Sequence, residues 1–147
     1  MTYNYLLKVA SDGDCLYAAV SHQLGLLDGP SAAPGVVALR RAAASTISAR
    51  RDDYLPFLTS PATGDLMSEG EFAAYLREVS DTNAWGGQLE LKALSEHLGR
   101  PLEVVQAEGP PMVVGEGEGK GPNLVIAYYR HMYGLGEHYN STKPGDE

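Results

Sequence analysis

The order of the predicted elements indicates an α+β domain, in which strands and helices occupy separate parts of the chain. One strand-like segment comes first, amphipathic helices fill the middle, and three strand-like segments follow residue 100. The chain has 147 residues, of which 44% are hydrophobic and 20% charged, and this is ordinary for one globular unit. No linker or internal repeat divides it. We therefore predict a single domain over residues 1–147.

The first strand and the first helix are separated by a turn. YNYLLKV, residues 3–9, is rich in residues that favour strands, and SDGD, residues 11–14, is typical of a turn that precedes a helix. We predict a helix from Cys15 to Leu24. Gly25 then stands where a left-handed residue would end that helix.

The middle of the chain predicts three more helical segments. PGVVALRRAAASTISARR, residues 34–51, has apolar residues at helical spacing, and its arginines fall where they favour the carboxyl end of the helix dipole. Two prolines limit residues 52–64 to a short helical piece and a loop. In SEGEFAAYLREV, Ser68 and Glu71 form a capping box. GGQLELKALSEHLG has an apolar stripe and ends at Gly99.

Three strands are predicted in the last third of the chain. They are PLEVVQA from residue 101, PMVVG from residue 111, and NLVIAYYR over residues 123–130, the last being apolar enough for a central strand. GEGEGKG, residues 115–121, contains glycines that suggest a phosphate-binding loop. We interpret it as a hairpin connection, because it lies between two strands, no helix follows it, and its two glutamates would repel phosphate.

The charge and the cysteine content restrict the class of protein. Nineteen acidic and eleven basic residues give a net charge of −8, which argues against nucleic acid or an anionic membrane as a partner and favours a basic one. A single cysteine forms no internal disulfide, and we find no signal peptide or membrane-spanning segment. We expect a soluble protein of the reducing cytoplasm, with the nucleus as the alternative. No metal-ligand spacing is present, so we expect no metal and no other cofactor.

Cys15 has two interpretations. At the start of a helix, unpaired N–H groups and the helix dipole lower the pKa of a thiol, and the same N–H groups can stabilise an oxyanion. Gly13 allows close approach of the backbone. However, a buried structural residue is the more frequent case for a lone cysteine.

The chain has four histidines that are candidates for a base beside such a thiol. His22 lies two turns along the first helix and His97 near the end of another, so each is most simply a solvated or capping residue. His131 follows the long apolar strand, where it either ends the strand or lines a cleft. His138 and Asn140 are one strand period apart and project to the same face. The Asn140 amide can thus orient the imidazole toward a nucleophile.

Four segments together resemble the ovarian tumour (OTU) family of cysteine deubiquitinases: DGDCLYAAV, NAWGGQLELKALSEHL, PLEVVQA and YYRHMYGLGEHYNS. They occur in the family's order and with similar spacing, from about Ser11 to Ser141. They look most similar to the OTU subgroup whose longer members carry an N-terminal helical extension, which we expect to be absent here. The resemblance implies a papain-like α+β sandwich, with a small, mostly antiparallel sheet flanked by helices.

The resemblance also implies roles for individual residues. Cys15 matches the nucleophile, His138 the general base and Asn140 the residue that orients the imidazole. Asp12 matches an acidic residue that is counted with the active site. The backbone of the oxyanion loop includes two further positions, Gly13 and Asp14. The candidates for the substrate cleft are Trp85, Gly86, Gly87 and His131, although a buried Trp85 that anchors its helix is an equal alternative.

Two positions depart from the family pattern. Asp14 stands where members often have asparagine or histidine, and an acid beside Cys15 opposes thiolate formation unless it points to solvent. Ala18 stands where a basic residue is common. We expect these differences to change rate and substrate preference rather than the class of reaction.

The function implied is that of a thiol-dependent deubiquitinase, a ubiquitinyl hydrolase that cleaves the ubiquitin–lysine bond through a thioester on Cys15. The partner implied is ubiquitin or a polyubiquitin chain, and we expect a monomer. Two alternatives stay open: a ubiquitin-binding module with weak turnover, and a thiol hydrolase for a ubiquitin-like modifier.

Overall fold

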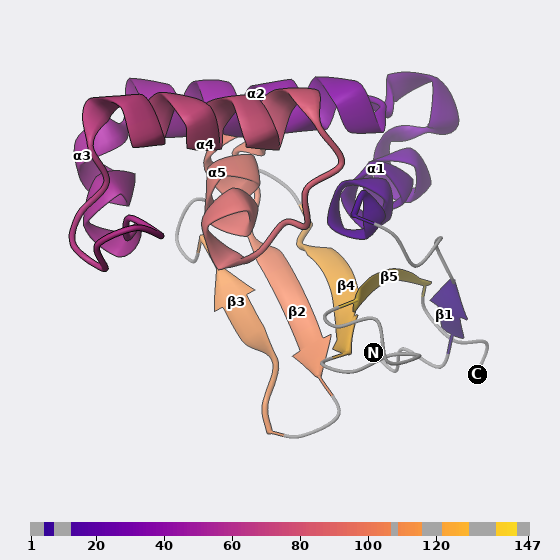
Figure 1. The fold of residues 1–147 in the computed structure, drawn as a ribbon. Coiled ribbons are helices and arrows are strands. Elements are labelled where there is room, and N and C mark those ends of the chain that lie inside the picture. The colour runs from indigo at the N-terminus through magenta and orange to yellow at the C-terminus, as the bar shows by residue number, and fades with distance from the viewer. Residues whose placement is uncertain (1–4, 8–12, 107–108, 116–121, 130–137, 144–147) are drawn as a thin grey trace.

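Figure 1 shows the computed structural model of the chain, which describes residues 5–7, 13–106, 109–115, 122–129 and 138–143. The helices are α1 (Cys15–Asp28), α2 (Val36–Ala49), α3 (Arg51–Tyr54), α4 (Glu69–Asp81) and α5 (Gln88–Leu98). The strands are β1 (Tyr5–Leu7), β2 (Leu102–Gln106), β3 (Met112–Val114), β4 (Leu124–Tyr129) and β5 (His138–Lys143). Strands therefore flank a block of helices along the chain, which confirms the predicted α+β class.

The described strands form one mixed sheet in the order β1-β5-β4-β2-β3. Pairing is antiparallel between β1 and β5, β5 and β4, and β2 and β3, whereas β2 and β4 run parallel. The sheet is thus mostly antiparallel, as predicted. The central strand is β4, and its residues Leu124, Val125, Ile126 and Ala127 are all buried, which explains its continuous apolar sequence.

The prediction of a hairpin connection at residues 115–121 is wrong. Strands β3 and β4 are not neighbours, because β2 lies between them and pairs with both. The periodicity of a strand reveals which residues alternate, but not which strand becomes its neighbour. Of this segment, only Gly115 lies within the described residues.

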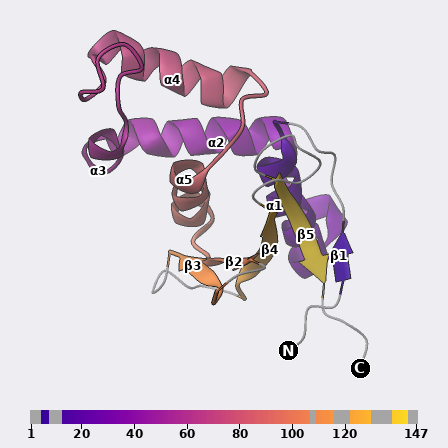
Figure 2. The same cartoon turned by 60° about the horizontal axis from the view of Figure 1, so that its bottom comes forward.

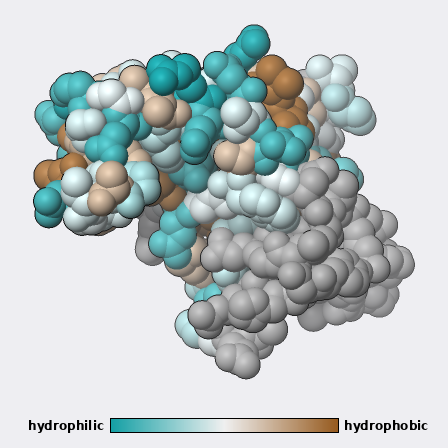
Figure 3. Space-filling view, in the orientation of Figure 1, coloured by the Kyte–Doolittle hydropathy of each residue, from teal (hydrophilic) through white to brown (hydrophobic). Residues whose placement is uncertain are grey.

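The helices form layers on the sheet. In Figure 2, α4, α2 and α5 follow one another from the outside toward the sheet, while α1 lies beside β4 and β5. Helix α2 contacts α1, α4 and α5, so it occupies the centre of the helical part. The outer helical surface is mainly hydrophilic, with a few apolar areas (Figure 3). No helix in the described ranges has the length and apolar character needed to cross a bilayer.

The predicted capping box of α4 is present. The Ser68 N–H donates to Glu71 Oε1 at 3.0 Å, and the Glu71 N–H donates to Ser68 Oγ at 3.2 Å. Helix α5 ends as predicted at Gly99, which has a left-handed φ of 67°, and His97 is exposed in the last turn. Both ends were predictable because the capping chemistry is local.

The end of α1 differs from the prediction. The helix continues through Gly25 to Asp28, and Gly29, with a φ of 99°, is the residue that ends it. The Gly29 N–H donates to the Gly25 carbonyl at 3.1 Å, so Gly25 forms part of the last turn. Two glycines four residues apart both fit the pattern of a helix end, and the second of them is the one that adopts the positive φ at which the helix stops.

The arginines of α2 are also placed differently from the prediction. The last turn of α2 contains no basic residue, and Arg50 follows the helix. Arg40 instead lies in the second turn and is 3% exposed, on the same face as the buried residues Ala43, Ala44 and Ile47. A charged side chain in that position must be stabilised by specific partners.

Candidate active site

Cys15 is the first residue of α1 and is 1% exposed. The first bond of the helix runs from the Ala18 N–H to the Asp14 carbonyl at 2.8 Å. The thiol therefore lies at the end of the helix where backbone N–H groups point outward and the dipole favours negative charge. Burial agrees with the structural interpretation of Cys15, but its place at the helix start is the one that thiol catalysis requires.

The turn before Cys15 is in contact with the loop between α4 and α5. A Cβ atom added to Gly13 would lie 1.6 Å from the carbonyl oxygen of Asn83 and 2.8 Å from its carbon. No side chain fits there. The close approach that the sequence predicted at Gly13 is thus made by the chain's own backbone, and it sets the distance between the turn and the loop.

The segment of Trp85, Gly86 and Gly87 lies against the first turn of α1. A Cβ on Gly86 would be 3.2 Å from Leu16 Cδ1 and 3.3 Å from the ring of Tyr17, so a side chain would press on the helix. Trp85 is 46% exposed, and the alternative of a buried anchor is therefore wrong. An exposed indole one residue from this contact is available to a ligand that approaches the start of α1.

A buried carboxylate holds the end of this segment. The Gly87 N–H donates to Glu90 Oε1 at 2.8 Å, and the Tyr75 hydroxyl donates to Glu90 Oε2 at 2.5 Å. Burial, and then the charge of Glu90, raise the pKa of Tyr75, so the phenol stays a neutral donor. The sequence reasoning missed Glu90. The sequence does contain a signal for its burial. Glu90 lies three residues before Ala93 and four before Leu94, so it shares the buried face of α5 with them.

We expect Glu90→Ala to destabilise the protein by about 1–3 kcal/mol, because it leaves the Gly87 N–H and the Tyr75 hydroxyl without their acceptor. The free energy of unfolding in urea measures this. Glu78→Ala on the exposed side of α4 is the matched control. If the two variants unfold at the same denaturant concentration, the Glu90 bonds do not stabilise the loop.

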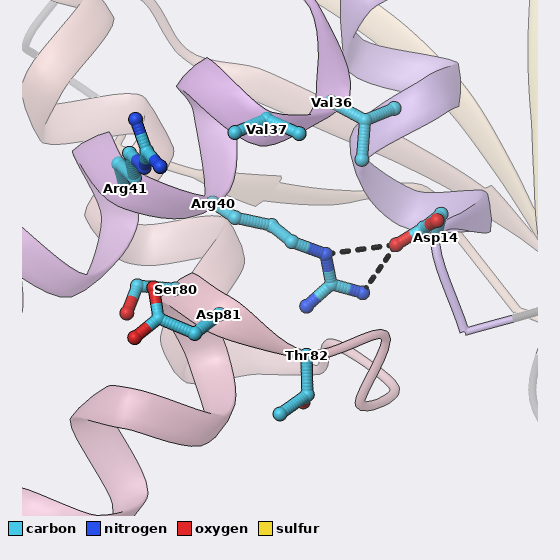
Figure 4. Close-up of a pocket in the computed structure, with 8 residues that line it drawn as sticks. All are labelled: Asp14, Val36, Val37, Arg40, Arg41, Ser80, Asp81 and Thr82. Atoms are coloured by element: carbon cyan, nitrogen blue, oxygen red, sulfur yellow. Dashed lines mark hydrogen bonds and ion pairs between the residues drawn. The ribbon is translucent and has the colours of Figure 1, made fainter.

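Arg40 connects the Cys15 turn to two other segments, and Figure 4 shows its contact with Asp14 of that turn. Its Nε donates to Asp14 Oδ1 at 2.8 Å, and its Nη2 donates to the Gly13 carbonyl at 2.9 Å and the Ala84 carbonyl at 2.8 Å. Its Nη1 donates to the Val79 carbonyl at 3.1 Å. One guanidinium thus joins the turn before Cys15, the end of α4 and the residue before Trp85. The sequence reasoning did not single out Arg40.

The ion pair of Arg40 and Asp14 corrects the expectation for Asp14. Arg40 Nη2 lies 2.6 Å from Asp14 Oδ1, and the Asp14 side chain is 39% exposed. Its carboxylate is therefore partly balanced by a cation and does not act on Cys15 as an isolated negative charge. The face of Arg40 also lies over the Tyr17 ring, 4.3 Å from its centroid.

A cavity of about 400 Å³ opens beside this ion pair. Its other walls come from the start of α2, with Val36, Val37 and Arg41, and from the end of α4, with Ser80, Asp81 and Thr82. The ion pair is thus reached from solvent on the side of Asp14.

Three of the remaining predicted site residues, His131, His138 and Asn140, belong to the last part of the chain. His138 and Asn140 lie in β5, as the prediction of an extended segment required, and Asn140 is 1% exposed beside Ala127 of β4. The side chain of His138 lies outside what the structure describes, as do Asp12 and His131.

Helix α1 is bonded directly to β4 and β5. Gln23 Nε2 donates to Ser141 Oγ at 3.0 Å and to the Thr142 carbonyl at 2.5 Å, and the Val125 N–H donates to Gln23 Oε1 at 2.8 Å. The exposed His22 also contributes, with its Nδ1 2.8 Å from Ser141 Oγ. These bonds fix the helix of Cys15 relative to the strand that contains His138.

An α+β fold with a thiol at a helix start, and a strand with His-x-Asn bonded to that helix, is the arrangement of a cysteine hydrolase. The family model described as "OTU-like cysteine protease" matches residues 10–139. The chain therefore belongs to the OTU family of cysteine proteases.

Curated relatives agree with this assignment. The chain is 49% identical over 135 residues to "Deubiquitinase OTUD6B" of Mus musculus, covering 92% of the chain and 45% of that protein. It is 35% identical over 136 residues to "OTU domain-containing protein 2" of Saccharomyces cerevisiae, covering 90% of the chain and 43% of that protein. The chain thus spans less than half the length of these relatives.

Solved structures agree on the fold. The OTU domain of OTUD1 superposes with a TM-score of 0.66 at 20% identity, covering 95% of this chain and 85% of that one. An OTU domain in complex with ubiquitin gives a TM-score of 0.68 at 16% identity, covering 94% of this chain and 68% of that one. The papain-like OTU fold predicted from the sequence is confirmed.

Proposed function

We propose that this chain is a deubiquitinating cysteine protease, a thiol-dependent isopeptidase in which Cys15 is the nucleophile. The observation that carries the proposal is the position of Cys15 as first residue of α1, after a turn bonded to Arg40 and packed on Asn83. Membership of the OTU family and relatives named deubiquitinases supply the substrate class. A protein of net charge −8 also suits a basic partner surface.

The proposed reaction is acyl transfer. The Cys15 thiolate attacks the carbonyl carbon of the terminal glycine of ubiquitin, and backbone N–H groups of the Gly13–Cys15 turn stabilise the oxyanion that forms. Protonated His138 then gives its proton to the lysine nitrogen as the C–N bond breaks, which leaves a thioester on Cys15. A water molecule, deprotonated by His138, hydrolyses the thioester and restores the thiol. Asn140 is proposed to orient the imidazole.

The test is a ubiquitin probe with a carboxyl-terminal electrophile, followed by a panel of di-ubiquitins of defined linkage. Because Cys15 is the only cysteine, the expected product is one protein joined to one ubiquitin, detected by intact mass. Unmodified ubiquitin is the control and should form no adduct. The panel should show cleavage of at least one linkage.

Two other results would replace the proposal with one of the alternatives. Retention on immobilised ubiquitin without an adduct or cleavage would identify a binding module. Labelling by the probe of a ubiquitin-like modifier, without labelling by the ubiquitin probe, would identify a different acyl substrate.

A further inference from the structure

We propose that Arg40 is a positioning residue for this reaction, because its guanidinium sets the direction of the peptide between Gly13 and Asp14. The N–H of that peptide belongs to Asp14. This N–H is the oxyanion donor whose direction Arg40 sets. This inference rests on the proposed function, since the oxyanion arises in the proposed acyl transfer.

The peptide geometry connects the two groups. The Gly13–Asp14 peptide is trans, so the Gly13 carbonyl and the Asp14 N–H point in opposite directions. The Gly13 carbonyl accepts from Arg40 Nη2 at 2.9 Å. The Asp14 N–H is therefore directed away from Arg40. A flipped peptide would point this N–H at the guanidinium and its carbonyl at the substrate side, where an oxyanion would be repelled.

The guanidinium is held more firmly than the turn that it binds. Arg40 is 3% exposed, and besides the turn it donates to the Val79 and Ala84 carbonyls and covers the Tyr17 ring. The Asp14 side chain, by contrast, is 39% exposed. Arg40 is thus the fixed point, and the turn before Cys15 takes its position from it.

The same contacts require arginine rather than any cation. The acceptors lie on separate segments, and the planar fork of donors reaches them together. A lysine has one charged nitrogen with three donors and cannot span the same acceptors. Arg40→Lys therefore keeps the charge but removes the geometry, which makes it the informative variant.

The experiment compares Arg40→Lys with Arg77→Lys, the matched control at an exposed position of α4. All assays are run well below the melting temperature of each variant. For Arg40→Lys we expect kcat for di-ubiquitin to fall about 100-fold, the loss typical of one oxyanion donor, with KM changed less than about threefold. Arg77→Lys should match the wild type in both.

Two reagents separate an oxyanion defect from other defects. Ubiquitin aldehyde forms a tetrahedral adduct with an oxyanion, so its inhibition constant should rise in parallel with the loss of kcat. Iodoacetamide alkylates the thiol without forming an oxyanion, so its rate at Cys15 should stay within about threefold of the wild type. A role in stability alone would move the melting temperature and neither kinetic constant.

The proposal is overturned if folded Arg40→Lys keeps the kcat and aldehyde affinity of the wild type. It is also overturned if the iodoacetamide rate falls as much as kcat, because Arg40 would then act on the thiol. If Arg40→Lys does not fold, Asp14→Asn decides. Asp14 is more exposed than Arg40, and for Asp14→Asn we expect both kcat and the affinity for ubiquitin aldehyde to fall about threefold to tenfold, without slower alkylation of Cys15. An unchanged kcat overturns the proposal.

Failure of the proposed function has a different signature. In that case the wild-type protein is not labelled by the ubiquitin probe, and both proposals fall together. If the wild type is labelled and Arg40→Lys equals it, the deubiquitinase assignment stands and the role of Arg40 alone is wrong.

Discussion

Replacing Cys15 with alanine is expected to abolish cleavage of di-ubiquitin, a loss of at least about 10⁴-fold in kcat, because no other group in the proposed reaction can form the thioester. Cys15 is the only cysteine, so no second thiol can substitute for it. The buried side chain loses only its sulfur atom, and the cost in folding free energy should be about 1 kcal/mol. Cleavage is measured by gel assay and stability by thermal unfolding.

The control for this prediction is Val20→Ala, which truncates another fully buried residue of α1. It should lower stability by about 1–2 kcal/mol and leave cleavage intact at temperatures where the protein is folded. Cleavage by Cys15→Ala at the wild-type rate would remove Cys15 from the mechanism. Binding of unmodified ubiquitin should survive in both variants.

Replacing Gly13 with alanine is the second change with a large expected effect. The new Cβ would lie 1.6 Å from the Asn83 carbonyl oxygen, which is backbone and cannot rotate away. The turn before Cys15 or the loop before Trp85 must therefore shift. We expect turnover to fall about 100-fold, because displacements of about 1 Å at a reacting group have effects of that size. Overpacking should also cost about 1–3 kcal/mol of stability.

Gly70→Ala is the matched control, since a Cβ at Gly70 in α4 meets nothing within 4 Å. There the same substitution should leave turnover unchanged and raise stability by up to about 1 kcal/mol, because alanine favours a helix. Steady-state kinetics and urea unfolding of both variants measure the difference. Wild-type turnover in Gly13→Ala would show that the contact with Asn83 has no part in positioning the turn.

Local chemistry explains which parts of the fold were predictable. The capping box of Ser68 and Glu71 and the end of α5 at Gly99 depend on neighbours within a few residues, and both were predicted correctly. The connection at residues 115–121 was misjudged because the pairing of β2 between β3 and β4 is a long-range choice. The end of α1 was misjudged because Gly25 and Gly29 both fit a helix end, and the sequence does not indicate which of the two adopts the positive φ.

The candidate site likewise contains residues that the sequence revealed and residues that it did not. Cys15 and Gly13 were found because a motif marks them, and the structure places them at the start of α1 as expected. Arg40 was missed because its partners Asp14, Gly13 and Ala84 lie 26 to 44 residues away in the chain, and such partners leave no local pattern. Glu90 was missed although its bond to the Gly87 N–H spans only three residues, because its other partner, Tyr75, lies 15 residues away. Their common signal is a charge at an apolar position of a helix. The catalytic roles of Cys15 and His138 stay predictions.

The bonds of Gln23 give the protein an order of events during synthesis. They join α1 to Val125, Ser141 and Thr142, which lie more than 100 residues further along the chain. Contacts of such sequence separation form late, after local structure has appeared. A ribosome must therefore release nearly the whole domain before the cysteine helix meets the strand with His138. A partly made chain carries the thiol without the strand that contains His138, so the proposed activity can begin only after translation of the domain is complete.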